Sequence, residues 1–306
     1  MNVGILDVDS LIANLALMKY SAHHKARGDS VSFYGPLDVT PDVLIASKLF
    51  DFTPDFAYFP DCEILRGGTG YDPAVRLPEW GDTIYPDYGL YGCTEAMGRF
   101  TRGCPRGCPF CLVGKMDGTR VHQVAELTDF WRGQRVVRLL DDNLTAMPDL
   151  FVSVCEQLAE LRVCVKFEAL DARFMTAYMA RSLAKVRREG RVHFAFDHVR
   201  DEEGVRRGIA ALKSGGFPLS QATFYVLIGY DSTPEQDLYR VMLLDALGVE
   251  SFAMPFNKSD RYQRRFSRWV NAKPAFRSCT FAEYDSSTRG ATMKGQESMF
   301  TVKEAS

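Results

Sequence analysis

Three closely spaced cysteines, Cys104, Cys108 and Cys111, follow the pattern C-x3-C-x2-C. Residues 102–111 also contain two prolines and two glycines, which disfavour helix and strand and predict a loop. Thiolates on one loop favour zinc or an iron–sulfur cluster. Zinc would need a fourth ligand such as Cys93 or a histidine, because no second C-x2-C is present. In a cubane cluster, three cysteines leave one iron open to a substrate or cofactor. Three unremarkable loop cysteines are the remaining alternative.

This spacing, with the aromatic Phe110 directly before the last cysteine, resembles the signature of the radical S-adenosylmethionine (radical SAM) enzymes. The resemblance implies a [4Fe–4S] cluster on Cys104, Cys108 and Cys111, with the fourth iron chelated by the amino and carboxylate groups of SAM. It implies reductive cleavage of SAM to methionine and a 5′-deoxyadenosyl radical that abstracts a hydrogen atom. It also implies a one-electron donor such as flavodoxin or ferredoxin, and a position near adenine for Phe110.

The chain from about residue 97 alternates short apolar runs with amphipathic segments, which predicts parallel strands joined by right-handed helical crossovers. The predicted strands are 97–101, 136–140, 163–167, 192–196, 222–228 and 251–254, and the predicted helices are 148–161, 175–189, 202–214, 234–247 and 261–270. Either a doubly wound layer or a partial barrel satisfies this pattern. The resemblance covers about residues 97–256 and implies the partial (β/α)6 TIM-like barrel.

The first 60 residues predict a separate, small, mostly parallel α/β unit. The predicted strands are 3–9, 30–34, 43–50 and 56–59, with Ser10 as the N-cap of the intervening helix. The unit resembles the Rossmann-like domain of cobalamin-binding radical SAM enzymes. The Asp-x-His-x-x-Gly motif of that domain is missing, so we expect no bound cobalamin. His23 and His24 are expected to be helix-end residues.

The predicted domain organisation has four parts. Residues 1–60 form the Rossmann-like unit, and 61–96 form a Gly/Pro-rich connection. Residues 97–285 form the barrel with a basic C-terminal helix, and 286–306 form a flexible tail. The glycine-rich stretch at 67–71 lacks the strand and G-K-S/T context of a phosphate loop, so we expect it to cover the active site or to join the domains.

In parallel α/β folds, functional side chains collect at the carboxyl ends of the strands. Asp141, Asp142 and Asn143 follow the second barrel strand, where the family contacts the SAM amino group. The sequence departs from the Gly-Gly-Glu often found there, although carboxylates and an amide suit an ammonium group. A solvated strand-to-helix turn explains the same residues without a ligand.

The third and fourth strand ends carry further candidates. Arg173 could bind the carboxylate of SAM or of the substrate in a bidentate way, or it could form an ion pair with Asp171 or Glu168. The resemblance implies that Asp197 contacts the SAM ribose hydroxyls. His198 is a candidate catalytic acid/base, or an incidental histidine near a strand end.

Gly229 and Tyr230 end the fifth strand. The resemblance implies that Gly229 packs on adenine, because glycine permits a close backbone approach. Tyr230 is a candidate catalytic residue in the substrate pocket, with plain packing as the alternative.

Seven basic residues and a single acid lie between residues 258 and 277, with aromatic residues interleaved. Basic groups suit phosphates, and aromatic rings can stack on bases. The candidate nucleic-acid-binding residues are Arg261, Arg264, Arg265, Arg268 and Trp269. The alternative is an amphipathic helix whose aromatic side packs on the barrel while its arginines are solvated.

The composition of the chain argues against several classes of protein but does not indicate a function. The formal charge is −2, so no global field favours nucleic acid or membrane. No apolar run approaches the length of a transmembrane helix, and residues 1–9 lack the basic start of a secretory signal. Eight cysteines without such a signal predict a reducing, cytoplasmic location.

Together these features predict a radical SAM enzyme. A nucleotide or a DNA or RNA base is the first candidate substrate, and a small metabolite or a peptide residue is the second. A non-catalytic iron–sulfur or zinc module that binds nucleic acid is an alternative of a different class. The reaction outcome stays open, because the sequence contains neither a second cluster motif for methylthiolation nor the usual corrinoid ligand.

Overall fold

The computed structural model describes residues 1–284. Its N-terminal part is a small parallel α/β unit. The elements of this unit are β1 (Asn2–Asp7), α1 (Leu15–Ala26), β2 (Ser30–Phe33), β3 (Val43–Ser47) and β4 (Glu63–Gly67). The strand order is β2-β1-β3-β4, and β3 is buried throughout, because α1 packs on one face and loop side chains cover the other. The predicted Rossmann-like unit is confirmed.

Two local predictions in this unit are wrong. The helix does not start after Ser10, because Asn14 is the N-cap and its side chain accepts from two amides of the first turn. Residues 56–59 form no strand, and the fourth strand is instead β4, which pairs in parallel with β3. The N-terminal unit therefore extends to Gly67, beyond the predicted boundary at residue 60.

The connection between the two units, residues 68–95, is held by buried polar contacts. Lys19 of α1 donates to two main-chain carbonyls of the connection at 2.5 and 2.9 Å. Tyr88 reaches into the second unit, where its hydroxyl accepts from the Met97 amide (2.9 Å) and donates to the Phe130 carbonyl (2.7 Å). The connection thus joins the two units, which is one of the two roles expected for it.

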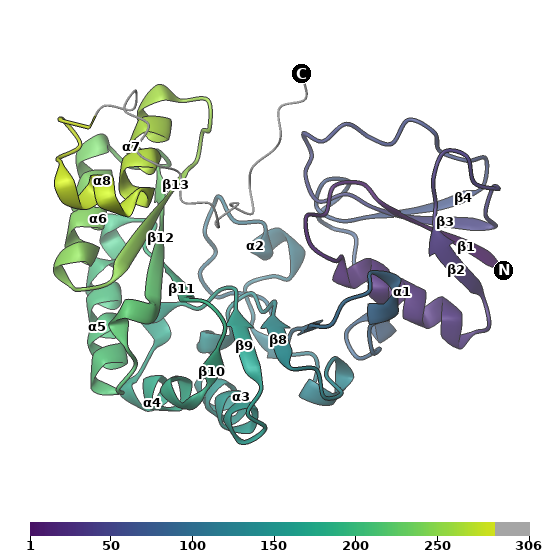
Figure 1. Ribbon diagram of the computed structural model, residues 1–306, viewed down its shortest axis with the longest axis horizontal. Coiled ribbons are helices and arrows are strands. Elements are labelled where there is room, and N and C mark those ends of the chain that lie inside the picture. The colour runs from purple at the N-terminus through teal and green to yellow at the C-terminus, as the bar shows by residue number, and fades with distance from the viewer. Residues whose placement is uncertain (285–306) are drawn as a thin grey trace.

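The second unit is a partial barrel of six parallel strands with helices on its outer side (Figure 1). Its strands are β5 (Ala96–Gly98), β8 (Val136–Leu139), β9 (Cys164–Phe167), β11 (Val192–Ala195), β12 (Ala222–Ile228) and β13 (Glu250–Pro255). Its helices are α3 (Pro148–Glu160), α4 (Ala177–Lys185), α5 (Glu202–Ser214), α6 (Pro234–Ala246), α7 (Arg261–Asn271) and α8 (Lys273–Ser278). The predicted (β/α)6 architecture is confirmed.

The barrel wall consists of two hydrogen-bonded sheets, β5-β8-β9 and β11-β12-β13. The short β10 (Arg187–Arg188) pairs with the lower part of β9, so the helix predicted over 175–189 ends earlier than expected. Between the sheets, the Leu170 amide donates to the His193 carbonyl at 3.0 Å. One apolar core runs beneath both sheets.

A buried ion pair on α6 fixes two of the strand ends. Arg240 and Asp237 are both fully buried and lie 2.6 Å apart. Arg240 also donates to the carbonyls of Phe196 (2.9 Å) and Leu227 (2.8 Å). A buried charge is tolerated when it is paired and its remaining donors are satisfied. This arginine therefore holds the ends of β11 and β12 in a defined position below the candidate site.

None of the helices in residues 1–284 is long and apolar enough to cross a membrane. The tail predicted at 286–306 lies outside the described residues.

Candidate active site

The three cysteines lie on a loop that a small antiparallel hairpin closes at its base. The hairpin strands are β6 (Thr101–Arg102) and β7 (His122–Gln123), with α2 (Val113–Met116) between them. Gly103 turns the chain with φ +86°, and an added Cβ there would lie 2.4 Å from the Arg120 carbonyl oxygen. The Cys104 amide then donates to the Gly118 carbonyl at 3.1 Å. The backbone thus determines where the cysteine loop begins.

All three cysteines are partly exposed, and each lies within electrostatic reach of another. Burial raises the pKa of the Cys108 and Cys111 thiols, and a neighbouring cysteine acts in the same direction on each. No three Cys, His or acidic side chains within residues 1–284 converge on a single ion. In a [4Fe–4S] cluster each thiolate binds a different iron.

Two polar side chains approach the cysteine sulfurs. Asn143 donates from Nδ2 to Cys104 Sγ at 3.4 Å, and Arg106 Nη2 lies 3.9 Å from Cys108 Sγ. Hydrogen bonds and positive charge near cluster sulfurs stabilise the thiolate ligands and tune the cluster. These two contacts therefore favour the thiolate forms of Cys104 and Cys108, against the effect of burial on Cys108.

Arg106 belongs to an alternating network of two arginines and two aspartates. Its Nη2 donates to Asp201 at 2.9 Å, and its Nη1 lies 4.0 Å from Asp171. Arg173 binds Asp171 through Nε (2.7 Å) and Nη2 (2.8 Å), and binds Asp201 through Nη1 (2.6 Å). Of the alternatives for Arg173, the structure therefore contains the ion pair with Asp171, and the prediction that it binds a carboxylate ligand is not supported. Glu168 is paired with Arg138 instead.

Asp141, predicted to bind the SAM amino group, has a structural role instead. It is 6% exposed, and its Oδ1 accepts from the amides of Phe100 (3.0 Å) and Thr101 (2.7 Å) and from the Thr101 hydroxyl (2.7 Å). Its Oδ2 is buried and has no partner among the described residues. Burial raises the pKa of Asp141 to about 6. The prediction for Asp141 is not supported, because Oδ1 already accepts three hydrogen bonds and Oδ2 is buried.

The next two residues lie beside the cysteine loop. Asp142 accepts from the Gly103 amide at 2.8 Å, and burial raises the pKa of its carboxyl. Asn143 accepts from the Thr145 hydroxyl at 2.6 Å while its amide faces Cys104. Both are thus positioned by the end of β8 and adjoin the loop, and their contact with SAM stays a prediction.

Asp197 and His198 follow β11. Asp197 accepts from the Leu227 amide at 3.2 Å, and burial raises the pKa of this carboxyl, which lies within electrostatic reach of Cys108. One of its oxygens is left for the predicted ribose contact. His198 caps a short turn, because its Nδ1 accepts from the Arg200 amide at 3.0 Å, so only Nε2 could act in proton transfer.

Three aromatic rings lie against one another above the barrel. Phe110 of the cysteine loop contacts Tyr230 (ring centroids 5.1 Å apart), and Tyr230 contacts Phe256 (4.8 Å). Phe110 and Phe256 are 36% and 54% exposed, so flat ligands can reach both. Sequence reasoning missed Phe256, although it follows β13 directly, as a strand-end criterion would have noted.

Gly229 was predicted to pack on adenine, and the structure gives it another neighbour. Its φ is +73°, and an added Cβ would lie 2.1 Å from Gln263 Nε2 on α7. The missing side chain therefore makes room for Gln263, whose Oε1 accepts from the Asn257 amide at 2.8 Å. The contact of the Gly229 backbone with adenine stays a prediction.

The basic helix α7 also differs in part from its prediction. Trp269 is 2% exposed and donates to the Cys279 carbonyl, so it is not available for base stacking. Arg265 is half-buried and donates to the Phe281 carbonyl at 2.9 Å. Arg261, Arg264 and Arg268 are exposed.

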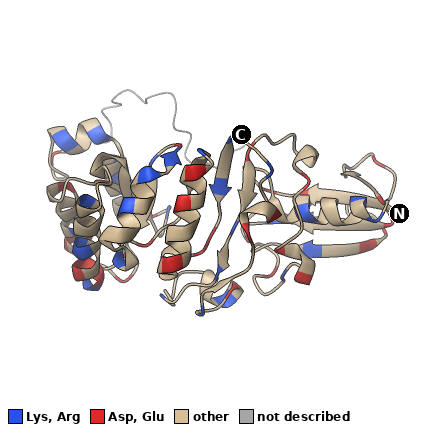
Figure 2. Cartoon of the chain, turned by 90° about the horizontal axis from the view of Figure 1, so that it is seen from below, with Lys and Arg blue, Asp and Glu red and all other residues tan. Residues whose placement is uncertain are grey.

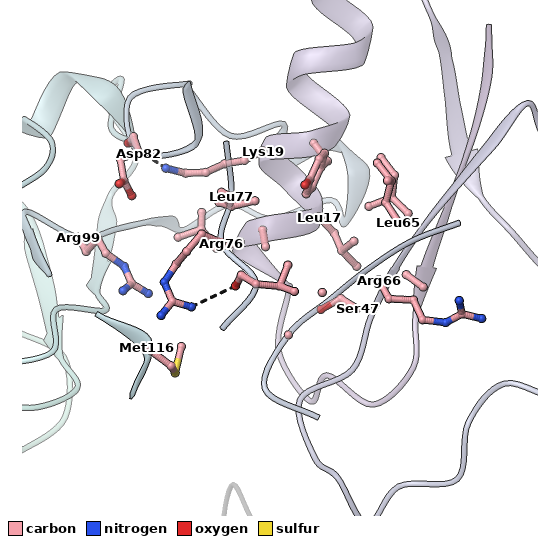
Figure 3. A pocket seen from close by; sticks show the side chains of 18 of the residues that line it. Leu17, Lys19, Ser47, Leu65, Arg66, Arg76, Leu77, Asp82, Arg99 and Met116 are labelled. Atoms are coloured by element: carbon pink, nitrogen blue, oxygen red, sulfur yellow. Dashed lines mark hydrogen bonds between the residues drawn. The ribbon is translucent and has the colours of Figure 1, made fainter. Parts of the chain in front are cut away.

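A cavity of about 180 Å³ lies between the carboxyl ends of β3 and β4 and the barrel (Figure 3). Apolar side chains such as Leu17, Leu65 and Leu77 line it, together with Arg76 and Lys19. Burial lowers the pKa of Lys19 to about 8. His23 and His24 lie in the last turn of α1, at the other end from the cavity, and do not line it.

The molecule therefore combines a Rossmann-like sheet with a partial TIM-like barrel, and its three cysteines lie at the carboxyl edge of the barrel. It is similar to the solved structure of the radical SAM methyltransferase TsrM from Kitasatospora setae, determined with cobalamin and a [4Fe–4S] cluster bound. The TM-score is 0.64 at 14% identity, over 83% of this chain and 74% of that one. At this identity the likeness concerns the fold. No protein-family model and no curated protein matches the sequence.

Gly103 and Gly107 provide a matched test of the cysteine loop. Gly103→Ala should lose most of the iron bound after anaerobic reconstitution, because its Cβ collides with backbone at 2.4 Å. Gly107→Ala should retain it, because its φ of +54° carries only conformational strain of ~1 kcal/mol and the nearest atom lies 4.0 Å away. Iron and sulfide per chain are measured, with circular dichroism to confirm folding. Equal iron in both variants would contradict this account of the loop.

Asp141 predicts a definite pH dependence of stability. Its folded pKa of about 6 lies above the ordinary value, so the folded state holds a proton that the unfolded chain has released, and stability falls as pH rises from ~4 to ~6. Asp141→Asn keeps an acceptor oxygen without the charge. Relative to wild type it should gain stability across this range, by on the order of 2–3 kcal/mol.

Urea unfolding at several pH values measures this difference, in which the contributions of Asp142 and Asp197 cancel. Asp141→Ala is the control, because it removes the acceptor of three hydrogen bonds and should be destabilised at every pH. If the difference in the free energy of unfolding between wild type and Asp141→Asn did not change with pH, the raised pKa of Asp141 would be contradicted.

Proposed function

We propose that this protein is a radical SAM enzyme that holds a [4Fe–4S] cluster on Cys104, Cys108 and Cys111. The observation that carries the proposal is the position of these cysteines. They lie on one structured loop at the carboxyl edge of a partial barrel, with an amide donor on Cys104 and a guanidinium beside Cys108. The structural likeness to a radical SAM enzyme supports the same assignment.

The residues around the loop have separate tasks in this proposal. Arg106 keeps a positive charge beside the Cys108 thiolate, and its bond to Asp201 fixes the direction of the guanidinium. Asn143 stabilises the Cys104 thiolate by donating to its sulfur. These two contacts stabilise the thiolates of Cys108 and Cys104.

The same edge offers groups for SAM. Asp142 and Asn143 suit its ammonium group, and Asp197 suits its ribose hydroxyls. Phe110 and Tyr230 offer ring faces and edges for adenine. When bound, the cluster supplies one electron, delivered by a donor such as flavodoxin or ferredoxin, which divides SAM into methionine and a 5′-deoxyadenosyl radical that takes a hydrogen atom from the substrate. We assign His198 Nε2 to any proton transfer that follows the abstraction of the hydrogen atom from the substrate.

The test is anaerobic reconstitution with iron and sulfide, followed by dithionite and SAM, with 5′-deoxyadenosine measured by mass spectrometry. Cys108→Ala should reduce the product to background, because a cluster ligand is lost. Cys93→Ala is the matched control, a partly exposed cysteine outside the loop, and should retain activity. Loss of metal in Cys93→Ala would favour a four-cysteine zinc site. A full iron load with no SAM cleavage under any condition would favour the non-catalytic binding module.

A second candidate is corrinoid-dependent methyl transfer, which the likeness to the methyltransferase TsrM favours. The residues present do not fit a corrinoid. The cavity beside β3 and β4 has a volume of about 180 Å³, below the ~300–1,000 Å³ of usual small-molecule sites, and no imidazole lines it. We therefore assign no step to cobalamin.

Equilibrium dialysis against hydroxocobalamin, read by its visible spectrum, tests this reading. We expect no stoichiometric retention, because the cavity is small and lacks an imidazole ligand. Serum albumin of equal concentration serves as the control for nonspecific uptake. One corrinoid retained per chain would restore methyl transfer as the first candidate.

A further inference from the structure

Helix α7 presents a row of arginines to solvent. It carries four arginines and no acidic residue over Arg261–Asn271. Arg261, Arg264 and Arg268 are exposed at helical spacing along one face, while Phe266 and Trp269 on the other face are buried. The helix is thus attached to the barrel by its aromatic side, and its charge faces outward.

The charge of this row is not compensated as it is on other helices. On α5, Arg206 and Arg207 pair with glutamates one turn earlier, at 2.7 and 2.5 Å. Within residues 1–284 the side chains of Arg261, Arg264 and Arg268 have no such partner. On other parts of the described chain, such as α5, basic and acidic positions occur together (Figure 2). Repulsion among neighbouring arginines costs stability, so an unbalanced row indicates an anionic ligand.

The row lines a hollow of about 450 Å³ together with residues 282–284. Glu283, the one acid of the described residues that line it, accepts from the Thr280 amide (2.9 Å) and hydroxyl (2.8 Å). Arg265 is held on one side of this hollow, because it donates to main-chain carbonyls and lies 4.4 Å from the Phe281 ring. A guanidinium fixed in this way loses little entropy when an anion binds.

The length of the row indicates a chain of charges rather than a single anion. At ~1.5 Å per residue, Arg261 and Arg268 lie ~10 Å apart along the helix axis. One phosphate needs only one or two guanidinium groups, whereas a row of this length matches successive phosphates of a strand.

The row also lies close in sequence to the rings above the barrel. α7 begins shortly after Phe256, which is exposed and in contact with Tyr230 beside the cysteine loop. A strand whose phosphates lie on α7 can therefore offer a base to Phe256. Base stacking on an exposed ring adds affinity with little dependence on sequence.

We propose that Arg261, Arg264, Arg265 and Arg268 bind the phosphate backbone of a nucleic-acid strand, with Phe256 receiving a base at the entrance of the active site. As a statement about the substrate, this rests on the proposed function. As a statement about binding, it stands on the α7 row alone.

The experiment is fluorescence anisotropy of labelled single-stranded RNA and DNA of roughly ten nucleotides with the reconstituted protein, from roughly 50 to 200 mM salt. Wild type should bind with a log–log salt slope of about −3, given ~0.7 per neutralised phosphate on single strands and one phosphate for each of the four arginines. Arg261→Gln with Arg264→Gln and Arg268→Gln should weaken binding at least ~10-fold and flatten the slope.

The matched control removes three exposed arginines elsewhere, Arg200→Gln with Arg206→Gln and Arg207→Gln, and should bind as wild type does. Phe256→Ala should weaken binding about tenfold with an unchanged salt slope, because stacking is not ionic. Absent or salt-independent binding, an equal loss in the control, or equal competition by polyglutamate would overturn the proposal, the last in favour of an acidic peptide.

The two proposals can fail separately. The α7 triple variant lies outside the cysteine site, so it should cleave SAM at the wild-type rate in the absence of substrate. Nucleic-acid binding without SAM cleavage would defeat the proposed function and leave the α7 site standing. SAM cleavage without nucleic-acid binding would defeat the α7 site alone.

Discussion

The buried carboxylate of Asp141 is the interaction on which the rest of the site depends. It lies at the end of β8, and its Oδ1 accepts from Phe100 and Thr101 at the start of the cysteine loop. These contacts fix β8 relative to the hairpin below the loop. They also place the next residues, Asp142 and Asn143, against Gly103 and Cys104. Three hydrogen bonds offset part of the desolvation of this carboxylate, and they give the loop a defined position.

The strands and helices of the barrel could be predicted from the sequence because they are local, whereas the choice of a partial barrel over a doubly wound layer came from the family resemblance. A buried parallel strand is a short apolar run, and a covering helix has a helical apolar period, so the bounds of β12 and α5 agree with their predictions. The wrong predictions concern segments whose secondary structure depends on pairing with a strand elsewhere in the chain. Residues 187–188 form β10 because they pair with the free edge of β9. The fourth strand of the N-terminal sheet is β4 and not residues 56–59, because β4 is the segment that pairs with β3.

The chemistry of the site could be predicted only where spacing alone specifies it, as with the three cysteines. Asp141 and Gly229 were placed correctly at strand ends, but the pattern did not show which residues they contact. For Arg173 and Trp269, the ion pair with Asp171 and the packing on the barrel were among the predicted alternatives, and the pattern could not choose between them. Their partners include residues far away in sequence, such as Phe100 for Asp141. A sequence pattern shows which residues reach the carboxyl edge, whereas the direction of each side chain depends on packing.

The barrel wall is not one continuous sheet, and this has a mechanical consequence. The halves β5-β8-β9 and β11-β12-β13 meet at a joint that is bridged by the Leu170–His193 hydrogen bond and by Arg173 on Asp201. Arg106 connects the same Asp201 to Cys108. A change of one unit charge at the cysteines therefore alters the forces across the joint. The cysteine loop thus reaches the joint between the two halves of the wall through both Asp201 and Asp171.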